Sequence, residues 1–259
     1  MILSSASTYT GSAKKIISLV PSQTELLYSL GLEEETLGIT KFCLYPSKWF
    51  ENKIRVGGTK TIDILRIIQL QPDLIIANKE ENAREQVEEL ARHFPVWITE
   101  VNTLKDAFQM ITDIGTLTGT SSKANLLSSE IKLKFAQPPF STKPIPVTYL
   151  IWKDPYMTIG GDTFINDMLN KAGFRNLFAG QLRYPEITID DIKNSGCNIL
   201  LLSSEPFPFK EKHIDVLQDQ LPGSIIKLVD GELFSWYGSR LLHSPAYFLK
   251  LRKELVGGS

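Results

Sequence analysis

The chain has 259 residues, 42% of them hydrophobic and 22% charged, and a formal net charge of −1. This is a globular composition with room for two lobes of about 120 residues each, and it excludes the basic footprint of a nucleic-acid-binding protein. No apolar run approaches the ~20 residues of a membrane-spanning helix, so none is expected.

The first fifteen residues have neither the basic start nor the apolar centre of a secretory signal. As written, the sequence therefore predicts no signal peptide, and a cytosolic location stays open. Further along, Cys43 lies between Phe42 and Leu44, and Cys197 stands just before the apolar run 199–202. We expect two buried thiols rather than a disulfide.

The first half alternates short apolar strands with helices. Ser22 and Glu25 have the spacing of a capping box that would open a helix ending at Gly31, and Asp63 is placed to start a short helix. The alternation predicts a parallel sheet covered by helices on both faces. We expect strands at 16–20, 37–40, 74–77 and 96–98, with later helices at 83–93 and 104–117.

A helix over 121–137 and a proline-rich break at 138–144 separate this half from the next. The predicted organisation is therefore a lobe at 1–118, a linking helix within 119–140 and a second lobe at 141–259.

The second half repeats the first in outline. TIDILRIIQLQPDLIIAN (61–78) and EITIDDIKNSGCNILLLS (186–203) both read as a short capped helix, a break and a buried strand. We further expect strands at 147–151, 199–202 and 225–229, a helix at 163–172, and Thr188 as the cap of a short helix. Two similar α/β lobes with a helix between them are the predicted architecture.

Motifs for catalysis are incomplete. The turn at 57–60 lacks the spacing of a phosphate-binding loop, and Gly160-Gly161 lacks a dinucleotide fingerprint, so both are interpreted as tight turns. His93 and His213 have charged helical neighbours typical of surface residues, while His243 opens the last helix. We expect no catalytic residue, no metal site and no enzymatic activity. An enzyme that uses Cys43 or His243 stays open as an alternative.

Aromatic and polar side chains follow several predicted strands, where ligands bind in parallel α/β sheets. Large rings with few ionisable neighbours favour a broad, flat and partly apolar ligand. The candidate ligand-binding residues are Phe42, Tyr45, Asn78, Lys79, Trp152, Tyr156, Arg183, Tyr184, Phe234, Trp236, Tyr237 and Arg240.

Several segments resemble the substrate-binding proteins of ABC importers for vitamin B12, haem and ferric siderophores. They are IISLVPSQTELLYSLGL, GITKFCLYP, RVGGTK, QPDLIIANKEEN, DPYMTIGGDTFINDMLNKAG and RYPEITIDDI. The resemblance covers about residues 15–255, and its cobalamin-binding branch is the most similar in pattern.

The resemblance implies Rossmann-like lobes joined by a single long α-helix, with a ligand cleft between them and no catalysis. It places cleft residues at Phe42, Tyr184, Glu232 and Phe234. Two positions that carry tryptophan in a cobalamin binder are Thr59 and Asn78 here, so another corrinoid or chelate stays open as the ligand.

The family also docks its permease through one acidic residue on each lobe. The resemblance places these positions at Asp190 and at Leu65, with Asp63 as the acidic substitute in the first lobe. It implies a monomer that works in the periplasm or cell envelope with an ABC permease as partner. A leaderless cytosolic carrier of a corrinoid or metal cofactor is the alternative of the same fold.

Overall fold

The computed structural model describes residues 1–136 and 143–256, which form two compact units. The first unit comprises residues 1–101, 105–132 and 237–240, and the second comprises the rest of the described chain. Most of the expected break at 138–144 lies outside the described residues. No helix in the described ranges is long and apolar enough to cross a membrane.

The first unit is built on a five-stranded parallel sheet with the strand order β3-β2-β1-β4-β5. Its central strands are buried along their whole length because helices cover both faces. Ile67 of α3 (Ile64–Leu70) and Leu90 of α4 (Arg84–His93) pack with Ile17 and Ile75 of the sheet. The strands are β1 (Ile16–Ser18), β2 (Thr36–Ile39), β3 (Ile54–Arg55), β4 (Leu74–Asn78) and β5 (Val96–Thr99).

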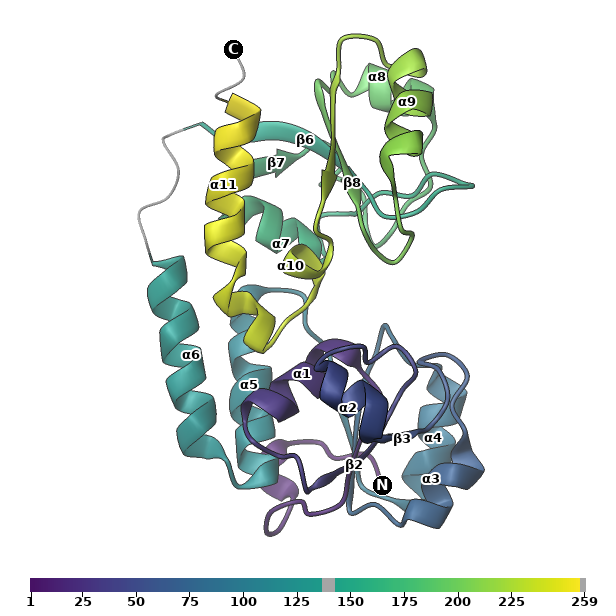
Figure 1. The fold of residues 1–259 in the computed structure, drawn as a ribbon, viewed down its shortest axis with the longest axis vertical. Coiled ribbons are helices and arrows are strands. Elements are labelled where there is room, and N and C mark those ends of the chain that lie inside the picture. Colours follow the sequence, from purple (N-terminus) through teal and green to yellow (C-terminus); the bar gives the residue numbers. More distant parts are fainter. Residues whose placement is uncertain (137–142, 257–259) are drawn as a thin grey trace. The chain divides into compact units, whose positions relative to one another are not determined.

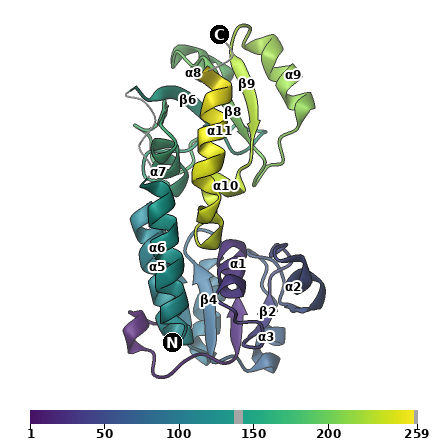
Figure 2. The ribbon, with the colours of Figure 1, turned by 60° about the vertical axis from the view of Figure 1, so that its left-hand side comes forward.

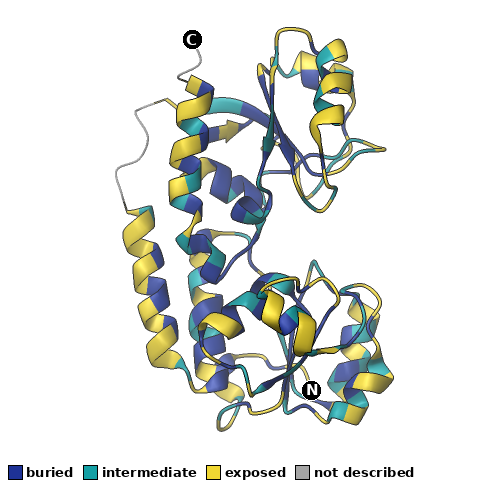
Figure 3. Cartoon of the chain, in the orientation of Figure 1, coloured by how far each residue is buried: buried dark blue, intermediate teal, exposed yellow. Residues whose placement is uncertain are grey.

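The helices of this unit follow the strands in a β-α alternation. Figures 1 and 2 show α5 and α6 running side by side, and Figure 3 shows α6 exposed along its outer face. The helices are α1 (Pro21–Ser29), α2 (Ser47–Asn52), α3 (Ile64–Leu70), α4 (Arg84–His93), α5 (Leu104–Thr118) and α6 (Ser121–Phe135), the last of which continues into the second unit.

The second unit has a four-stranded parallel sheet with the order β7-β6-β8-β9. Ile192 of α8 (Ile189–Asn194) and Leu217 of α9 (Glu211–Gln220) pack against Leu200 of its sheet, as residues of α3 and α4 do in the first unit. Its strands are β6 (Ile145–Leu150), β7 (Phe174–Asn176), β8 (Ile199–Ser203) and β9 (Ile225–Val229). Its helices are α7 (Phe164–Lys171), α8 (Ile189–Asn194), α9 (Glu211–Gln220), α10 (Glu232–Ser235) and α11 (Ser244–Val256).

The two sequence segments predicted to correspond have the same local structure. Asp63 and Thr188 are the N-caps of α3 and α8, and each side chain accepts a hydrogen bond from the backbone three residues on. Gln71 (φ 48°) and Gly196 (φ 72°) then take the left-handed conformation before β4 and β8. The expectation of two α/β units with parallel sheets is confirmed.

Other expectations need correction. The capping box at Ser22 is wrong, because α1 begins at Pro21, two residues before the start that a Ser22 cap implies, and its N-cap, Val20, provides no side-chain hydrogen bond. Proline fits the first helical position since its fixed φ is already helical and the missing N–H has no partner there. Cys43 and Cys197 are free and buried, as predicted.

Candidate functional site

The strands of each sheet are parallel, so the carboxyl ends of all strands in a unit share one edge. The loops that leave this edge carry most of the predicted ligand-binding residues. The two units are described separately below.

In the first unit, the loop after β4 is organised by two asparagines. The Asn78 side chain is buried and accepts hydrogen bonds from the backbone N–H of Glu80 (2.8 Å) and Glu81 (3.1 Å). The Asn82 amide donates to the carbonyls of Leu19 (3.2 Å) and Thr59 (3.1 Å), and its oxygen accepts from the Asn78 N–H (2.8 Å). Asn78 therefore shapes the loop, and a direct ligand contact by it stays a prediction.

The loop after β2 presents exposed rings. Phe42 is 51% exposed and Tyr45 is 42% exposed. A Cβ on Gly58 would lie 3.2 Å from the Phe42 ring, so the glycine lets this ring lie against the turn after β3. Lys41 Nζ stands 5.2 Å from the centre of the same ring. Lys79, also predicted for this site, is exposed and forms an ion pair with Glu100 (2.9 Å).

Residues 237–240 pack on the first unit although they come from the end of the chain. The Arg240 guanidinium forms two contacts of 3.0 Å with the Glu25 carboxylate and lies 4.6 Å from the centre of the Tyr45 ring. The Tyr237 hydroxyl lies 3.3 Å from Glu81 Oε1. Burial, followed by the nearby Glu81 charge, raises the Tyr237 pKa well above its ordinary value.

In the second unit, Trp152 follows β6 and is 39% exposed. Tyr156 is half-buried against the core beneath α8 and α9, and burial raises its pKa. Arg183 and Tyr184 lie in the segment before α8, with the guanidinium 5.7 Å from the tyrosine ring centre. The Arg183 N–H donates to Asp162 Oδ1 (2.6 Å), which fixes this segment against the loop before α7.

The predicted residues after β9 are less accessible. Phe234 has no exposed surface and packs against Tyr149 (5.4 Å between ring centres) and Phe248 (4.6 Å). At this position the structure favours core packing over ligand contact. Trp236 is buried, and the partly exposed Glu232 begins α10.

Neither Phe207 nor His213 is among the predicted ligand-binding residues, yet in the second unit Phe207 lies next to Trp152 and His213 lies next to Phe207. The Trp152 and Phe207 ring centres are 5.8 Å apart, and His213 lies 5.4 Å from Phe207. His213 is half-buried rather than on the surface as predicted, because Phe207 and Phe209 flank its ring. The rule that found Trp152, an aromatic residue after a strand, would also have found Phe207 after β8.

The glycine turns are structural. Gly57 has φ 94°, and a Cβ there would meet the Thr61 carbonyl oxygen at 2.4 Å. A Cβ on Gly161 would lie 2.2 Å from the Ala179 carbonyl oxygen. Close backbone packing explains both glycines, in line with the prediction of tight turns.

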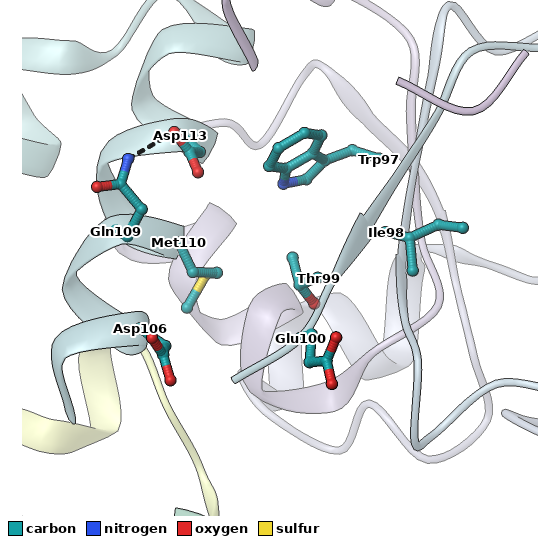
Figure 4. A pocket seen from close by; sticks show the side chains of 8 residues that line it. All are labelled: Trp97, Ile98, Thr99, Glu100, Asp106, Gln109, Met110 and Asp113. Atoms are coloured by element: carbon teal, nitrogen blue, oxygen red, sulfur yellow. Dashed lines mark hydrogen bonds between the residues drawn. The ribbon is translucent and has the colours of Figure 1, made fainter. Parts of the chain in front are cut away.

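A pocket of about 140 Å³ lies between β5 and α5 of the first unit (Figure 4). Gln109 donates to Asp113 Oδ1 (3.0 Å) on its wall, and burial raises the Asp113 pKa. No predicted ligand-binding residue lines it, so it is separate from the strand-end loops. Its lining residues are Trp97, Ile98, Thr99, Glu100, Asp106, Gln109, Met110 and Asp113.

Comparisons with known proteins agree with this architecture. A family model described as "Periplasmic binding protein" matches residues 16–221. The vitamin B12-binding protein of Vibrio campbellii is 26% identical over 208 residues, which are 78% of this chain and 75% of the relative. The uncharacterized ABC transporter substrate-binding lipoprotein YvrC of Bacillus subtilis is 29% identical over 191 residues, or 69% of this chain and 60% of that protein.

Among solved structures, a periplasmic haem-binding protein from Pseudomonas aeruginosa shares the fold. Its TM-score is 0.78 at 18% identity, over 95% of this chain and 94% of that chain. The relatives are substrate-binding proteins, which supports the expectation that this protein is not an enzyme. Because the family match extends over most of its length, the chain belongs to the periplasmic binding protein family.

Proposed function

We propose that this protein captures a metal chelate outside the cytoplasm and delivers it to an ABC importer without altering it. The ligand would be cobalamin or another corrinoid, haem or a ferric siderophore. Family membership and relatives named as vitamin B12-binding proteins and as an ABC transporter lipoprotein support this role. They do not favour the alternative of a cytosolic carrier.

The observation that carries the proposal is the set of exposed rings at the strand ends. Phe42, Tyr45 and Trp152 are 51%, 42% and 39% exposed, respectively. Large aromatic surfaces left in water are a favourable contact area for a flat, partly apolar molecule. In parallel α/β proteins this edge is where ligands bind.

Titration of the purified protein with cyanocobalamin, haemin and a ferric hydroxamate tests the proposal. We expect tight binding of one chelate class, with quenching of tryptophan fluorescence and a change in the absorbance of the chelate. Binding of none of the three would contradict the proposed function.

Substitutions locate the site. Burying one aromatic side chain contributes about 1.5–3 kcal/mol, so Phe42→Ala and Trp152→Ala should each weaken chelate binding roughly 10- to 100-fold. Tyr28→Ala is the matched control, since Tyr28 is 43% exposed on α1 and contacts Trp49 instead. Equal effects of all three substitutions would place the ligand elsewhere.

For the permease we propose docking through Asp190 and Asp63. Asp190 is exposed at the start of α8, 3.8 Å from Lys193, whereas the equivalent position on α3 is Leu65, 74% exposed. Asp63 is exposed two residues before Leu65. Asp190→Asn should reduce chelate uptake through the permease and leave chelate affinity unchanged; unchanged uptake would contradict the assignment.

A further inference from the structure

The loops after β6 and β8 form a small aromatic wall in the second unit. The Phe207 N–H donates to the Ile151 carbonyl (3.3 Å), which holds the two loops together. Trp152 and Phe207 on these loops and His213 in the first turn of α9 follow one another at ring-centre distances of 5.8 and 5.4 Å. All three rings keep some solvent exposure, unlike Phe209 behind them.

The hydrogen bonding of His213 fixes its tautomer. The Lys210 backbone N–H donates to His213 Nδ1 at 2.8 Å, so Nδ1 must carry a lone pair and the ring proton must sit on Nε2. Nε2 has no hydrogen-bond partner among residues 1–136 and 143–256. His213 therefore offers an N–H donor. It offers no lone pair on Nε2 with which to bind a metal ion.

Positive charge surrounds this donor. Burial lowers the His213 pKa most, and the charges of Lys212, Lys153 and Lys210 lower it further, while Asp154 opposes them. Asp154 is already paired with Lys153. An N–H donor in such surroundings suits an anionic oxygen, because a charged acceptor strengthens the hydrogen bond and gains from the nearby cations.

We propose that His213 Nε2–H donates to a carboxylate on the rim of a planar chelate that lies against Trp152 and Phe207. This inference rests on the proposed function and narrows it to a chelate with peripheral carboxylates. His213 acts here as a specificity-determining residue that hydrogen-bonds to the rim of the ligand and does not coordinate its metal.

Haemin and its dimethyl ester provide the test, since they differ only in whether the rim carboxylates are free. We expect the wild-type protein to bind haemin at least 10-fold more tightly than the ester. His213→Phe should remove this preference by weakening haemin binding alone, and His213→Gln should retain it because the amide supplies both an acceptor and a donor. His93→Phe, on exposed α4, is the matched control.

The outcomes separate the two proposals. Binding of no haemin, cobalamin or siderophore by the wild type would overturn the proposed function. Three outcomes would overturn only the role of His213. The wild type could bind cobalamin or a siderophore but not haemin, or it could bind haemin and the ester with equal affinity. His213→Phe could also weaken the binding of haemin and of the ester equally. A changed Soret band of bound haem in His213→Gln would also overturn it, because that change would mean iron ligation. If His213→Phe does not fold, the comparison of haemin with its ester and the His213→Gln variant still test whether His213 binds a rim carboxylate.

Discussion

Asn82 joins three parts of the first unit through one amide group. Its side chain bonds the end of β1 at Leu19, the turn after β3 at Thr59 and the end of β4 at Asn78. These are neighbouring loops at the edge that carries Phe42. Because the amide is buried, water cannot replace the bonds that it makes.

Asn82→Ala should therefore lower the free energy of unfolding by about 1–3 kcal/mol, the cost of leaving buried polar groups unpaired. Urea denaturation measures this change. Asn52→Ala is the control, because Asn52 is exposed and bonds only its own helix at Lys48. A loss no larger than that of the control would show that Asn82 does not hold the loops.

We expect His213 to make the stability of the folded chain depend on pH. Its folded pKa lies below the ordinary 6.5 because burial and Lys212, Lys153 and Lys210 disfavour the charged ring more than Asp154 favours it. A lowered folded pKa means that the unfolded chain takes up the proton first. The stability that the folded state gains from a neutral His213 is complete above about pH 6.5, and it is lost as the pH falls through the lower pKa of the folded state.

Urea midpoints measured from pH 7.5 to 5 should therefore fall, and the fall should be smaller in His213→Gln. His93→Gln provides the comparison, since His93 is exposed and lies 3.4 Å from Glu89. The same pH dependence in wild type and His213→Gln would assign the effect to other groups.

For single residues, the sequence predicts which side chains lie at the sheet edge better than it predicts which of them are exposed there. Phe42 and Trp152 could be selected because a ring directly after an apolar strand lies at the sheet edge. Phe234 satisfies the same rule but points into a core formed with Phe248, a contact that only the folded chain reveals. The charged sequence neighbours of His213 predict a surface residue, whereas in the folded chain Phe207 and Phe209 flank its ring.

At the scale of elements, one helix–strand unit occurs twice. Helices α3 and α8 are short, begin at a capping side chain, are followed by a residue in the left-handed conformation and lead into a fully buried strand. Short helices have little stability of their own, so their caps and their packing on the sheet determine where they form.

Thr188→Ala should cost about 1 kcal/mol of stability, because it removes half of the capping box that Thr188 forms with Asp191. Thermal or urea unfolding measures the loss. The control is Thr116→Ala, since the Thr116 hydroxyl bonds only the Thr112 carbonyl within α5. If both substitutions cost the same, the capping box does not stabilise α8.

Most strands could be predicted because buried parallel strands are continuous apolar runs. β3 and β7 could not, since they span only two and three residues and include the charged Arg55 and Arg175. The helix α1 begins two residues before the start that a Ser22 cap predicts, because both Pro21 and Ser22 are good starting residues and the fixed φ of proline prevails.

At the scale of the whole molecule, the chain enters the second unit and returns. After α10 it contributes residues 237–240 to the first unit and then completes the second with α11. The returning segment is held by the ion pair of Arg240 with Glu25 and by close packing of Gly238 against Leu26.

Arg240→Ala should lower the free energy of unfolding by about 1–3 kcal/mol, because it leaves the largely buried Glu25 carboxylate without its partner. A double-mutant cycle with Glu25→Ala should show coupling of roughly 1 kcal/mol or more. Lys79→Ala is the control, since the Lys79–Glu100 pair is exposed and should change stability little. Additive effects of Arg240→Ala and Glu25→Ala would mean that the pair does not hold the segment.

The returning segment also has a consequence for synthesis. A ribosome releases the sheet of the first unit early, yet residues 237–240 emerge only after nearly all of the second. Until then Glu25 lacks its ion-pair partner Arg240, and the surface of Leu26 that contacts Gly238 is uncovered. The nascent first unit therefore has a binding site for residues 237–240 before they are made, and a separately produced fragment of residues 1–132 would keep that site uncovered.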